Sequence, residues 1–327
     1  MLKSRSNSVL ILLTLIVLAV CLRLINIGLS DIGTDEVFSI YIAQLPISKI
    51  VDVLAQGDNP PLWEILVHQI DRFFGTNVNT IRYISFIFSV LTLIPLYYLG
   101  EYFIGKYAGL VASSLFIFSD FALFIAQEAR VYALLGLLCC FSIVLFLKAL
   151  QQPYKTINWL FLAVINSLIF YSHYLGTWII VIEVLYWLLN HLRDKKRRWF
   201  IYSLALTLLL TLPQFPTLLN RFLESGTAGT WIPKTSSISD LYYMILKFSN
   251  EPVIAIVLIV LCLIPLVNGL KGEISIFVLW FWIPLVGSFL LSFKIGFFLD
   301  RYLYFILPGV YLLVAEGLFI IKQRIEN

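Results

Sequence analysis

Charged residues are scarce in this chain. Asp, Glu, Lys and Arg make up 13% of its 327 residues, whereas 60% are hydrophobic and the mean hydropathy is +0.92. Soluble globular proteins carry about 25% charged residues, so this composition excludes an ordinary soluble domain. A helix needs roughly 20 apolar residues to cross a membrane. The length accommodates about ten spans, and we predict an all-α, polytopic membrane protein.

Residues that ligate metals are also few. The chain has three histidines and four cysteines, and all of the cysteines lie inside apolar segments: Cys21, Cys139, Cys140 and Cys262. None has the spacing of a zinc site, so we expect them to pack as small apolar side chains. The net charge is only +4, and membrane topology explains the basic clusters better than a nucleic-acid patch does. Nucleic acid is not an expected partner.

Apolar runs predict where the chain crosses the membrane. The fifth and sixth runs are separated only by Ser172-His173-Tyr174, so two separate spans and one re-entrant hairpin are alternative interpretations. The predicted spans lie near residues 8–28, 80–103, 107–125, 131–150, 157–172, 174–191, 199–215, 253–269, 274–293 and 302–321.

The basic residues predict the orientation of these spans. With the N-terminus inside, more than half of the 23 lysines and arginines fall on the inner face, including the run 193–198. Positive charge is concentrated on the cytoplasmic side of membrane proteins. We therefore predict a plasma-membrane protein with both termini in the cytoplasm. The run itself is expected to anchor the topology, with binding of anionic lipid headgroups as the alternative.

Two long loops are predicted on the outer face, where most carboxylates lie. The first, residues 29–79, contains amphipathic pieces at 35–45, 46–56 and 60–74 that are too short and polar to span. They are expected to lie along the membrane surface. The second loop, 216–252, ends in a short amphipathic helix at 239–248.

The acidic pair Asp35-Glu36 follows the first apolar run. In one interpretation Asp35 caps a surface helix and binds its free backbone N–H groups. In the other, Asp35 is a general base at the outer face and Glu36 assists it. The rarity of charge in this chain favours catalysis, with capping as a second task for Asp35. For Glu36, assistance to the base and no catalytic role remain alternatives.

A proline elbow, Pro60-Pro61, follows Asp58 and Asn59 in the first outer loop. Consecutive prolines fix an extended turn and permit a helix to start after it. We interpret the segment as a rigid connection between surface helices. Asp58 and Asn59 are candidates to bind a polar ligand from this elbow.

Glu128, Arg130 and Tyr132 lie between the third and fourth spans. Glu128 and Tyr132 are four residues apart, so we expect them on one helical face. Arg130 needs a partner at this depth, and Glu128 and Asp35 are the candidates. The alternatives are a ligand-binding site and a purely structural Glu–Arg pair.

Two further candidate segments open or close spans at the outer face. His173 and Tyr174 lie among aromatic residues, where a hydrogen-bonded interface role competes with ligand binding. Arg301 offers a planar fork suited to a phosphate, and Tyr302 adds a hydroxyl group. The alternative for Arg301 is an interaction with lipid headgroups.

Taken in order, these segments resemble the integral-membrane GT-C glycosyltransferases, and most closely the bacterial family related to protein mannosyltransferases and aminoarabinose transferases. The resemblance covers nearly the whole chain. The segments that carry it are Asp35-Glu36, Asn59-Pro60-Pro61-Leu62, Gln127-Glu128-Ala129-Arg130-Val131-Tyr132, Ser172-His173-Tyr174 and Asp300-Arg301-Tyr302-Leu303.

The resemblance implies a GT-C fold and transfer of a sugar from a polyprenyl-phosphate carrier to an acceptor at the outer face, generally with inversion. It matches Asp35 to the general base, Arg301 and Tyr302 to a segment that could hold the carrier phosphate, and Glu128 with Arg130 to a motif that shapes the cavity. Asn59 stands where many relatives have His, so no acid role follows there.

The resemblance also implies an organisation and a set of partners. Residues 1–215 would form a catalytic membrane module, 216–252 an outer loop and 253–327 a three-helix membrane segment. The donor would be a polyprenyl-phosphate sugar, the acceptor a lipid, glycan or protein, and membrane lipids would surround the chain. Larger relatives continue further, so the acceptor-binding part is expected to be reduced or supplied by another subunit. No outer Asp-x-Asp pattern supports a divalent metal as cofactor.

Two other functions fit a membrane protein of this composition. A transporter or flippase for lipid-linked saccharides predicts polar residues along a path through the bilayer, but only Glu183 and Glu316 lie deep within predicted spans. A non-catalytic membrane subunit predicts that Asp35→Asn leaves function unchanged. The clustering of polar candidates at one face favours the transferase.

Overall fold

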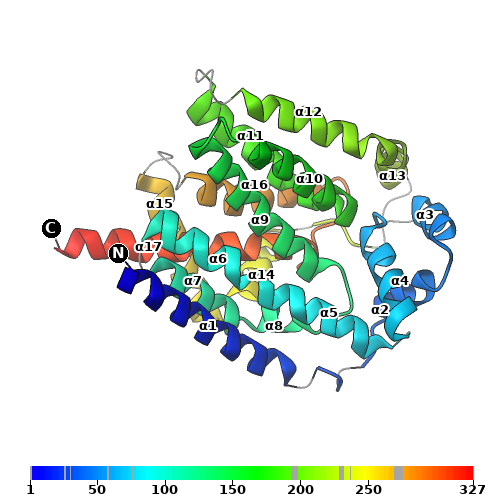
Figure 1. Ribbon diagram of the computed structural model, residues 1–327, viewed down its shortest axis with the longest axis horizontal. Coiled ribbons are helices and arrows are strands. Elements are labelled where there is room, and N and C mark those ends of the chain that lie inside the picture. Colours follow the sequence, from blue (N-terminus) through cyan, green and yellow to red (C-terminus); the bar gives the residue numbers. More distant parts are fainter. Residues whose placement is uncertain are drawn as a thin grey trace.

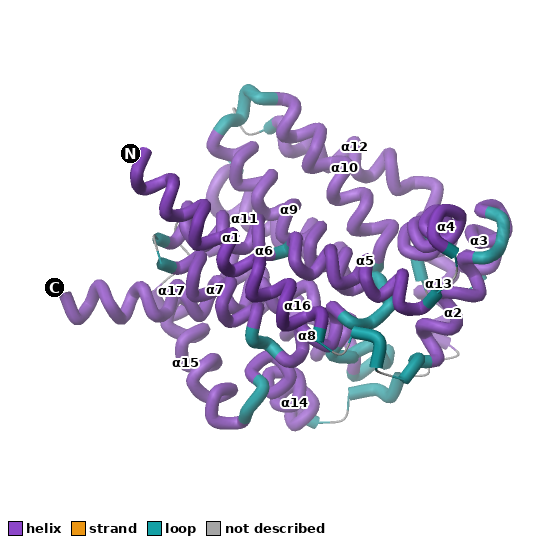
Figure 2. Tube along the Cα trace, turned by 60° about the horizontal axis from the view of Figure 1, so that its bottom comes forward, coloured by secondary structure: helices purple, strands orange, loops and turns teal. Residues whose placement is uncertain are grey.

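The computed structural model describes residues 2–25, 27–29, 31–56, 59–75, 77–105, 107–192, 198–227, 232–235, 237–268 and 275–326. Within these ranges all regular structure is helical and no strand occurs (Figures 1 and 2). The predicted all-α class is confirmed.

The helices follow one another with short connections. The N-terminal part contains α1 (Leu2–Leu24), α2 (Thr34–Ala43), α3 (Ile47–Ala55), α4 (Leu62–Phe74), α5 (Val78–Leu91), α6 (Leu93–Leu99), the π-helix η1 (Gly100–Ile104), α7 (Ala108–Ile117), α8 (Asp120–Ala126) and α9 (Tyr132–Gln151). The C-terminal part contains α10 (Thr156–Ser172), η2 (Tyr174–Thr177), α11 (Trp178–His191), α12 (Trp199–Thr211), η4 (Leu212–Gln214), α13 (Phe215–Thr227), α14 (Ile238–Ser249), α15 (Pro252–Asn268), α16 (Ser275–Ser292), η5 (Arg301–Ile306) and α17 (Leu307–Glu326).

Helices α9 and α17 form the centre of the bundle (Figure 1). Helix α9 packs against α5 and α10, and α17 packs against α7, α15 and α16. Both are apolar on nearly every side, which is the pattern of a helix enclosed by others. Helix α12 lies at the edge and exposes most of its apolar surface. Because α9 and α17 are enclosed along their length, a polar binding site is expected at their ends.

Two glycines let neighbouring helices approach α17 closely. A Cβ atom on Gly317 would lie 2.4 Å from the backbone oxygen of Leu261 in α15, and one on Gly309 would lie 2.8 Å from the Trp280 ring in α16. Small residues at helix contacts are typical of membrane bundles, where packing rather than exclusion of water drives association.

Fewer helices than the predicted ten have the length and apolar composition of a membrane span. Among the described residues, four helices are long and apolar enough to cross a membrane, or six if each of two bent pairs is one span. Three shorter apolar helices, 8–24, 156–172 and 276–292, coincide with further predicted spans. Ten spans remain a prediction.

The two bent pairs meet at one corner of the molecule. The predicted third span is broken into α7 and α8 with a bend of 65°, where Ser119 caps α8 by accepting from the N–H of Ala122. Helices α14 and α15 meet at 96°. Asn250 at that turn has φ 67°. Its side chain accepts from the N–H of Asp120 at 3.0 Å and donates to the carbonyl of Phe118 at 3.0 Å.

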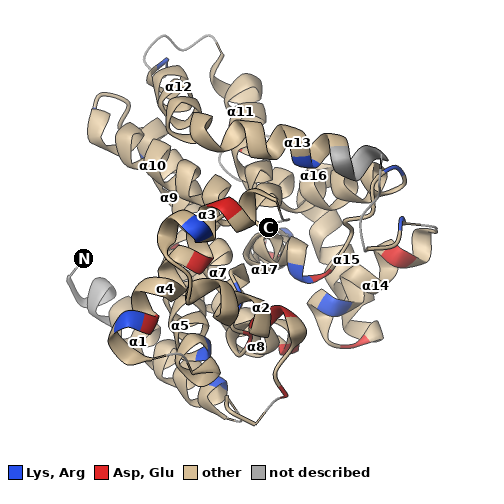
Figure 3. Cartoon of the chain, turned by 90° about the vertical axis from the view of Figure 1, so that its right-hand side faces the viewer, with Lys and Arg blue, Asp and Glu red and all other residues tan. Residues whose placement is uncertain are grey.

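The amphipathic pieces predicted at 35–45, 46–56, 60–74 and 239–248 are helical, as α2, α3, α4 and α14, and their position along a membrane surface remains a prediction. Helices α2 to α4 lie together at one end of the molecule, and both termini lie toward the opposite end (Figures 1 and 2). Termini on the same side are what an even number of crossings produces. Figure 3 looks onto the α2–α4 end, where acidic and basic residues lie close to one another around α2.

Candidate active site

Glu36 fixes the start of α2. Its Oε2 accepts from the backbone N–H of Gly33 at 3.0 Å, so Glu36 rather than Asp35 caps this helix. Arg82 donates to both carboxylate oxygens, at 2.7 and 3.0 Å, and the N–H of Ala129 adds a fourth hydrogen bond at 2.7 Å. Burial alone would raise the pKa of Glu36, but these donors hold it below its ordinary value. The alternative of Asp35 as the cap is therefore wrong.

Asp35 instead turns toward the last helix of the chain. Its Oδ2 lies 2.9 Å from Nη2 of Arg301, and Nη1 of the same guanidinium lies 3.1 Å from Oε1 of Glu128. Arg301 is held in place by Asp300, whose carboxylate accepts from the Arg301 backbone N–H at the start of η5. One cation therefore bridges two carboxylates from distant parts of the sequence.

Glu128 lies in the turn between α8 and α9. The expectation that Glu128 and Tyr132 share a helical face is wrong, because α9 begins only at Tyr132. The basic partner of Glu128 is Arg301 rather than Arg130. Burial raises the pKa of Glu128, and the charges of Arg301 and Arg130 oppose that shift.

Arg130 braces α2 from behind the site. It is buried, and its Nη1 donates to the backbone carbonyl of Asp35 at 2.9 Å and to Ser39 Oγ at 2.8 Å. Ser39 in turn donates to Oε1 of Glu64 at 3.2 Å. Burial raises the pKa of Glu64, and the charge of Arg130 opposes it. Arg130 therefore positions the backbone of Asp35.

Arg82 and Glu64 were not among the predicted site residues. Arg82 lies in α5 and Glu64 in α4, and both side chains are almost fully buried. A charged residue inside the predicted span 80–103 is itself a signal, because such a residue needs a partner. The sequence around Glu64 gave a weaker indication, because an acidic residue is common in an amphipathic surface helix.

An aromatic cluster supports the segment that carries Arg301. The ring of His173 lies 4.8 Å from that of Tyr302 and 6.0 Å from that of Tyr132. Burial and the charge of Arg130 lower the pKa of His173 to about 4, so the imidazole is neutral at pH 7. Tyr132, His173 and Tyr302 thus meet, although they come from α9, the end of α10 and η5.

Three predicted site residues are not brought into this group. Tyr174 packs on Phe170 and accepts from Gln214 Nε2 at 3.0 Å. Asn59 is partly exposed and lines neither of the cavities described below. Asp58 lies outside the described residues. Binding roles for these three remain predictions.

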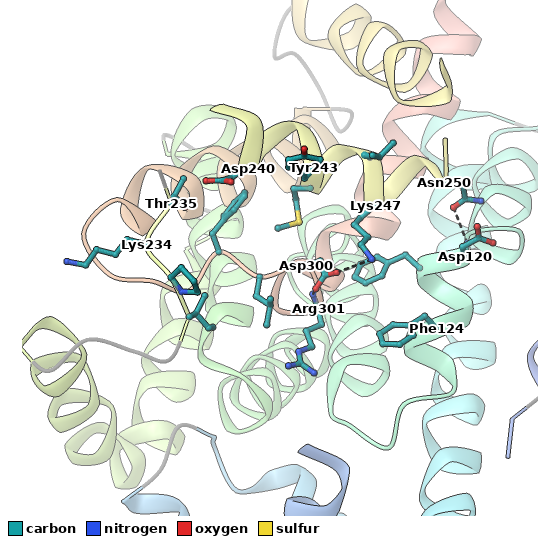
Figure 4. Close-up of a pocket in the computed structure, with 17 residues that line it drawn as sticks. Asp120, Phe124, Lys234, Thr235, Asp240, Tyr243, Lys247, Asn250, Asp300 and Arg301 are labelled. Carbon is teal, nitrogen blue, oxygen red and sulfur yellow. Dashed lines mark hydrogen bonds and ion pairs between the residues drawn. The ribbon is translucent and has the colours of Figure 1, made fainter. Parts of the chain in front are cut away.

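Two cavities meet at Arg301. The α2 cavity, of about 520 Å³, is lined by residues 31 and 33–36 together with Arg82, Phe124, Gln127, Glu128 and Arg301. The α14 cavity, of about 990 Å³, lies between α8, α14 and residues 232–235 and 298–301 (Figure 4). Phe124 and Arg301 line both. Among the described residues, no group of three or more His, Cys, Asp or Glu side chains could hold a metal ion.

Solved structures with the same arrangement of helices identify the fold. ArnT from Cupriavidus metallidurans bound to undecaprenyl phosphate matches with a TM-score of 0.70 over 96% of this chain, at 11% identity. AglB from Archaeoglobus fulgidus, an archaeal oligosaccharyltransferase in complex with an inhibitory peptide and a dolichol-phosphate, matches with a TM-score of 0.69 over 98%, at 13% identity. The chain has the GT-C fold.

Sequence comparison agrees with this GT-C assignment. The family model for dolichyl-phosphate-mannose-protein mannosyltransferases matches residues 58–216, from the elbow to the start of α13. A search of curated proteins finds no match. The chain spans 63% of that ArnT chain and 51% of the AglB chain. The predicted resemblance to membrane glycosyltransferases is confirmed.

Proposed function

We propose that this GT-C protein is a glycosyltransferase that moves a sugar from a polyprenyl-phosphate-linked donor to a hydroxyl group of an acceptor at the outer membrane face. The observation that carries the proposal is the contact between Asp35 and Arg301 at the junction of two cavities. A transfer between two bulky substrates needs two spaces that meet at a base and a cation. The ArnT and AglB structures with bound polyprenyl phosphates support this choice of donor.

The chemistry assigns one role to each charged group. The acceptor oxygen attacks the anomeric carbon of the sugar while Asp35 takes the hydroxyl proton. The bond from that carbon to the phosphate oxygen breaks, and its electron pair leaves on the phosphate, where Arg301 stabilises the growing negative charge. The products are a glycosylated acceptor and a polyprenyl phosphate. Attack opposite to the leaving group inverts the anomeric configuration.

The other residues support this pair. Glu36 has four donors on its two oxygens, so it is occupied in holding α2 and has no capacity to assist proton transfer. Arg130 holds the Asp35 backbone. Tyr132, His173 and Tyr302 hold the start of η5 by aromatic packing. These are positioning roles.

The experiment supplies purified protein with candidate polyprenyl-phosphate sugars and candidate acceptors that carry a hydroxyl group, and follows loss of the donor. We expect Asp35→Asn to slow the loss by about 100-fold or more, because a positioned general base contributes on that order. The matched control is Asp52→Asn on α3, which removes an exposed aspartate that pairs with Lys49 and lines neither cavity. Donor loss that continues at the wild-type rate in Asp35→Asn would refute the assignment.

A further inference from the structure

Both terminal nitrogens of Arg301 already contact carboxylates in the free protein. Its two terminal nitrogens face Asp35 at 2.9 Å and Glu128 at 3.1 Å. A general base that is ion-paired with a cation must leave that contact before it can reach the hydroxyl group of an acceptor. A cation that is ion-paired is likewise less available to a phosphate. The free protein therefore holds both of its proposed reacting groups in a contact that must open before either can meet its substrate.

The two contacts of Arg301 differ in how readily they can be exchanged. The Asp35 side chain is 39% exposed, whereas that of Glu128 is 11% exposed. Half-exposed ion pairs contribute little net stability and break easily. Because Arg130 binds the backbone carbonyl of Asp35, the carboxylate can rotate away while α2 stays in place. Asp35 is thus the partner that a competing anion would replace.

The charges around the two cavities indicate from which side an anion arrives. The α2 cavity is lined by four carboxylates, Asp31, Asp35, Glu36 and Glu128, against two guanidinium groups. The α14 cavity is balanced, since it is lined by the cations Lys234, Lys247 and Arg301 against the carboxylates Asp120, Asp240 and Asp300. Lys247 lies 3.6 Å from Asp300, directly beside Arg301 (Figure 4). An anionic group meets less repulsion in the α14 cavity, and an uncharged hydroxyl group suits the acidic α2 cavity.

We propose that the donor phosphate enters through the α14 cavity and replaces Asp35 on Arg301, so that the carboxylate is released toward the acceptor in the α2 cavity. This inference rests on the proposed function and adds an order to it: the donor binds first and thereby frees the base. Glu128 keeps the guanidinium aimed at the junction throughout. The phosphate then accepts a charge-assisted hydrogen bond from Nη2, the nitrogen that Asp35 leaves.

The exchange predicts that the proposed base competes with the carrier. Undecaprenyl phosphate in detergent micelles serves as the probe, and its Kd is measured for purified wild-type protein and variants. Asp35→Asn is expected to tighten binding about two- to fivefold, the equivalent of one partly exposed ion pair. Arg301→Gln is expected to weaken it about tenfold or more. A gain in affinity cannot come from a variant that fails to fold.

A double variant separates the exchange from simple charge repulsion. In Asp35→Asn/Arg301→Gln the gain should vanish, because Asp35 acts on the carrier only through Arg301. A gain that persists without Arg301 would overturn the exchange, as would an unchanged or weakened Kd in Asp35→Asn alone. Asp52→Asn, the exposed control on α3, should leave the Kd unchanged.

The α14 entry has its own matched pair of variants. Lys247→Gln should weaken carrier binding about threefold, whereas Lys49→Gln, an exposed lysine with the same 3.6 Å separation from its aspartate, should not. Equal effects would contradict entry through the α14 cavity. A protein that transfers sugar while Asp35→Asn shows no gain keeps the proposed function and loses only the exchange. Absence of transfer with every donor would remove both.

Discussion

Asp35 and Glu36 are neighbours in the sequence, but their carboxylates lie in different environments. Glu36 is buried and bonded to Arg82, Gly33 and Ala129, whereas Asp35 is partly exposed where two cavities meet. Sequence alone could place both at one membrane face but could not tell them apart. The distinction depends on helix phase and on Arg82, which no local pattern links to Glu36.

The Glu36–Arg82 pair predicts acid sensitivity. Because the pKa of folded Glu36 lies below its unfolded value near 4.5, its stabilising effect is present above that pH and is lost as the pH falls through the lower folded pKa. Glu36→Gln should lower the free energy of unfolding at pH 7 by about 3 kcal/mol, since Arg82 would be left buried without its counter-ion.

Thermal unfolding in detergent between pH 7 and about pH 2 measures this. The difference between wild type and Glu36→Gln should shrink toward the acid end. Glu326→Gln, an exposed glutamate in the last turn of α17, should behave as wild type throughout. A difference that stays constant with pH would contradict the assigned role of Glu36.

At the level of helices, the corner that forms the α14 cavity was the part least accessible to sequence analysis. The amphipathic pieces 35–45, 46–56, 60–74 and 239–248 were predicted close to where α2, α3, α4 and α14 lie. The break at Ser119 and the turn at Asn250 were not predicted. Hydropathy reports that a segment is apolar but not its direction, and Ser119 and Asn250 have their effect through contacts with other segments.

Asn250 should be the residue that maintains this corner. Asn250→Ala loses two side-chain hydrogen bonds and places alanine at positive φ, which together should cost about 2 kcal/mol of stability. Asn250→Gly keeps the backbone conformation and should cost about half as much. Asn220→Ala, on an exposed position of α13, is the control for thermal unfolding. Equal losses for the alanine and glycine variants would exclude a contribution from the backbone.

For the whole molecule, composition and motif order were sufficient to predict an all-helical GT-C fold, and the confirmed fold shows that sparse motifs are informative when their order and sidedness agree. The sequence placed Asp35 and Arg301 at the same membrane face, but the direct contacts of Arg301 with Asp35 and Glu128 could not be derived, because they depend on how α17 packs at the centre. The number of spans and their orientation remain predictions, because helix length and composition do not determine them.

Orientation has a direct test. In a Cys21→Ala background, single cysteines at Ser48 on α3 and at Gln323 near the end of α17 are both exposed on the protein surface. A membrane-impermeant thiol reagent should label the Ser48→Cys variant in intact cells and the Gln323→Cys variant only after permeabilisation. The reverse pattern would place the cavities on the cytoplasmic side.

The central claim is that Asp35 and Arg301 transfer a sugar from a polyprenyl phosphate. The most direct measurement supplies an anomerically pure donor together with an acceptor and quantifies both products. The account predicts one polyprenyl phosphate released for each acceptor glycosylated with inverted configuration, and parallel loss of both products in Asp35→Asn. Retained configuration, or carrier release that is independent of Asp35, would contradict it.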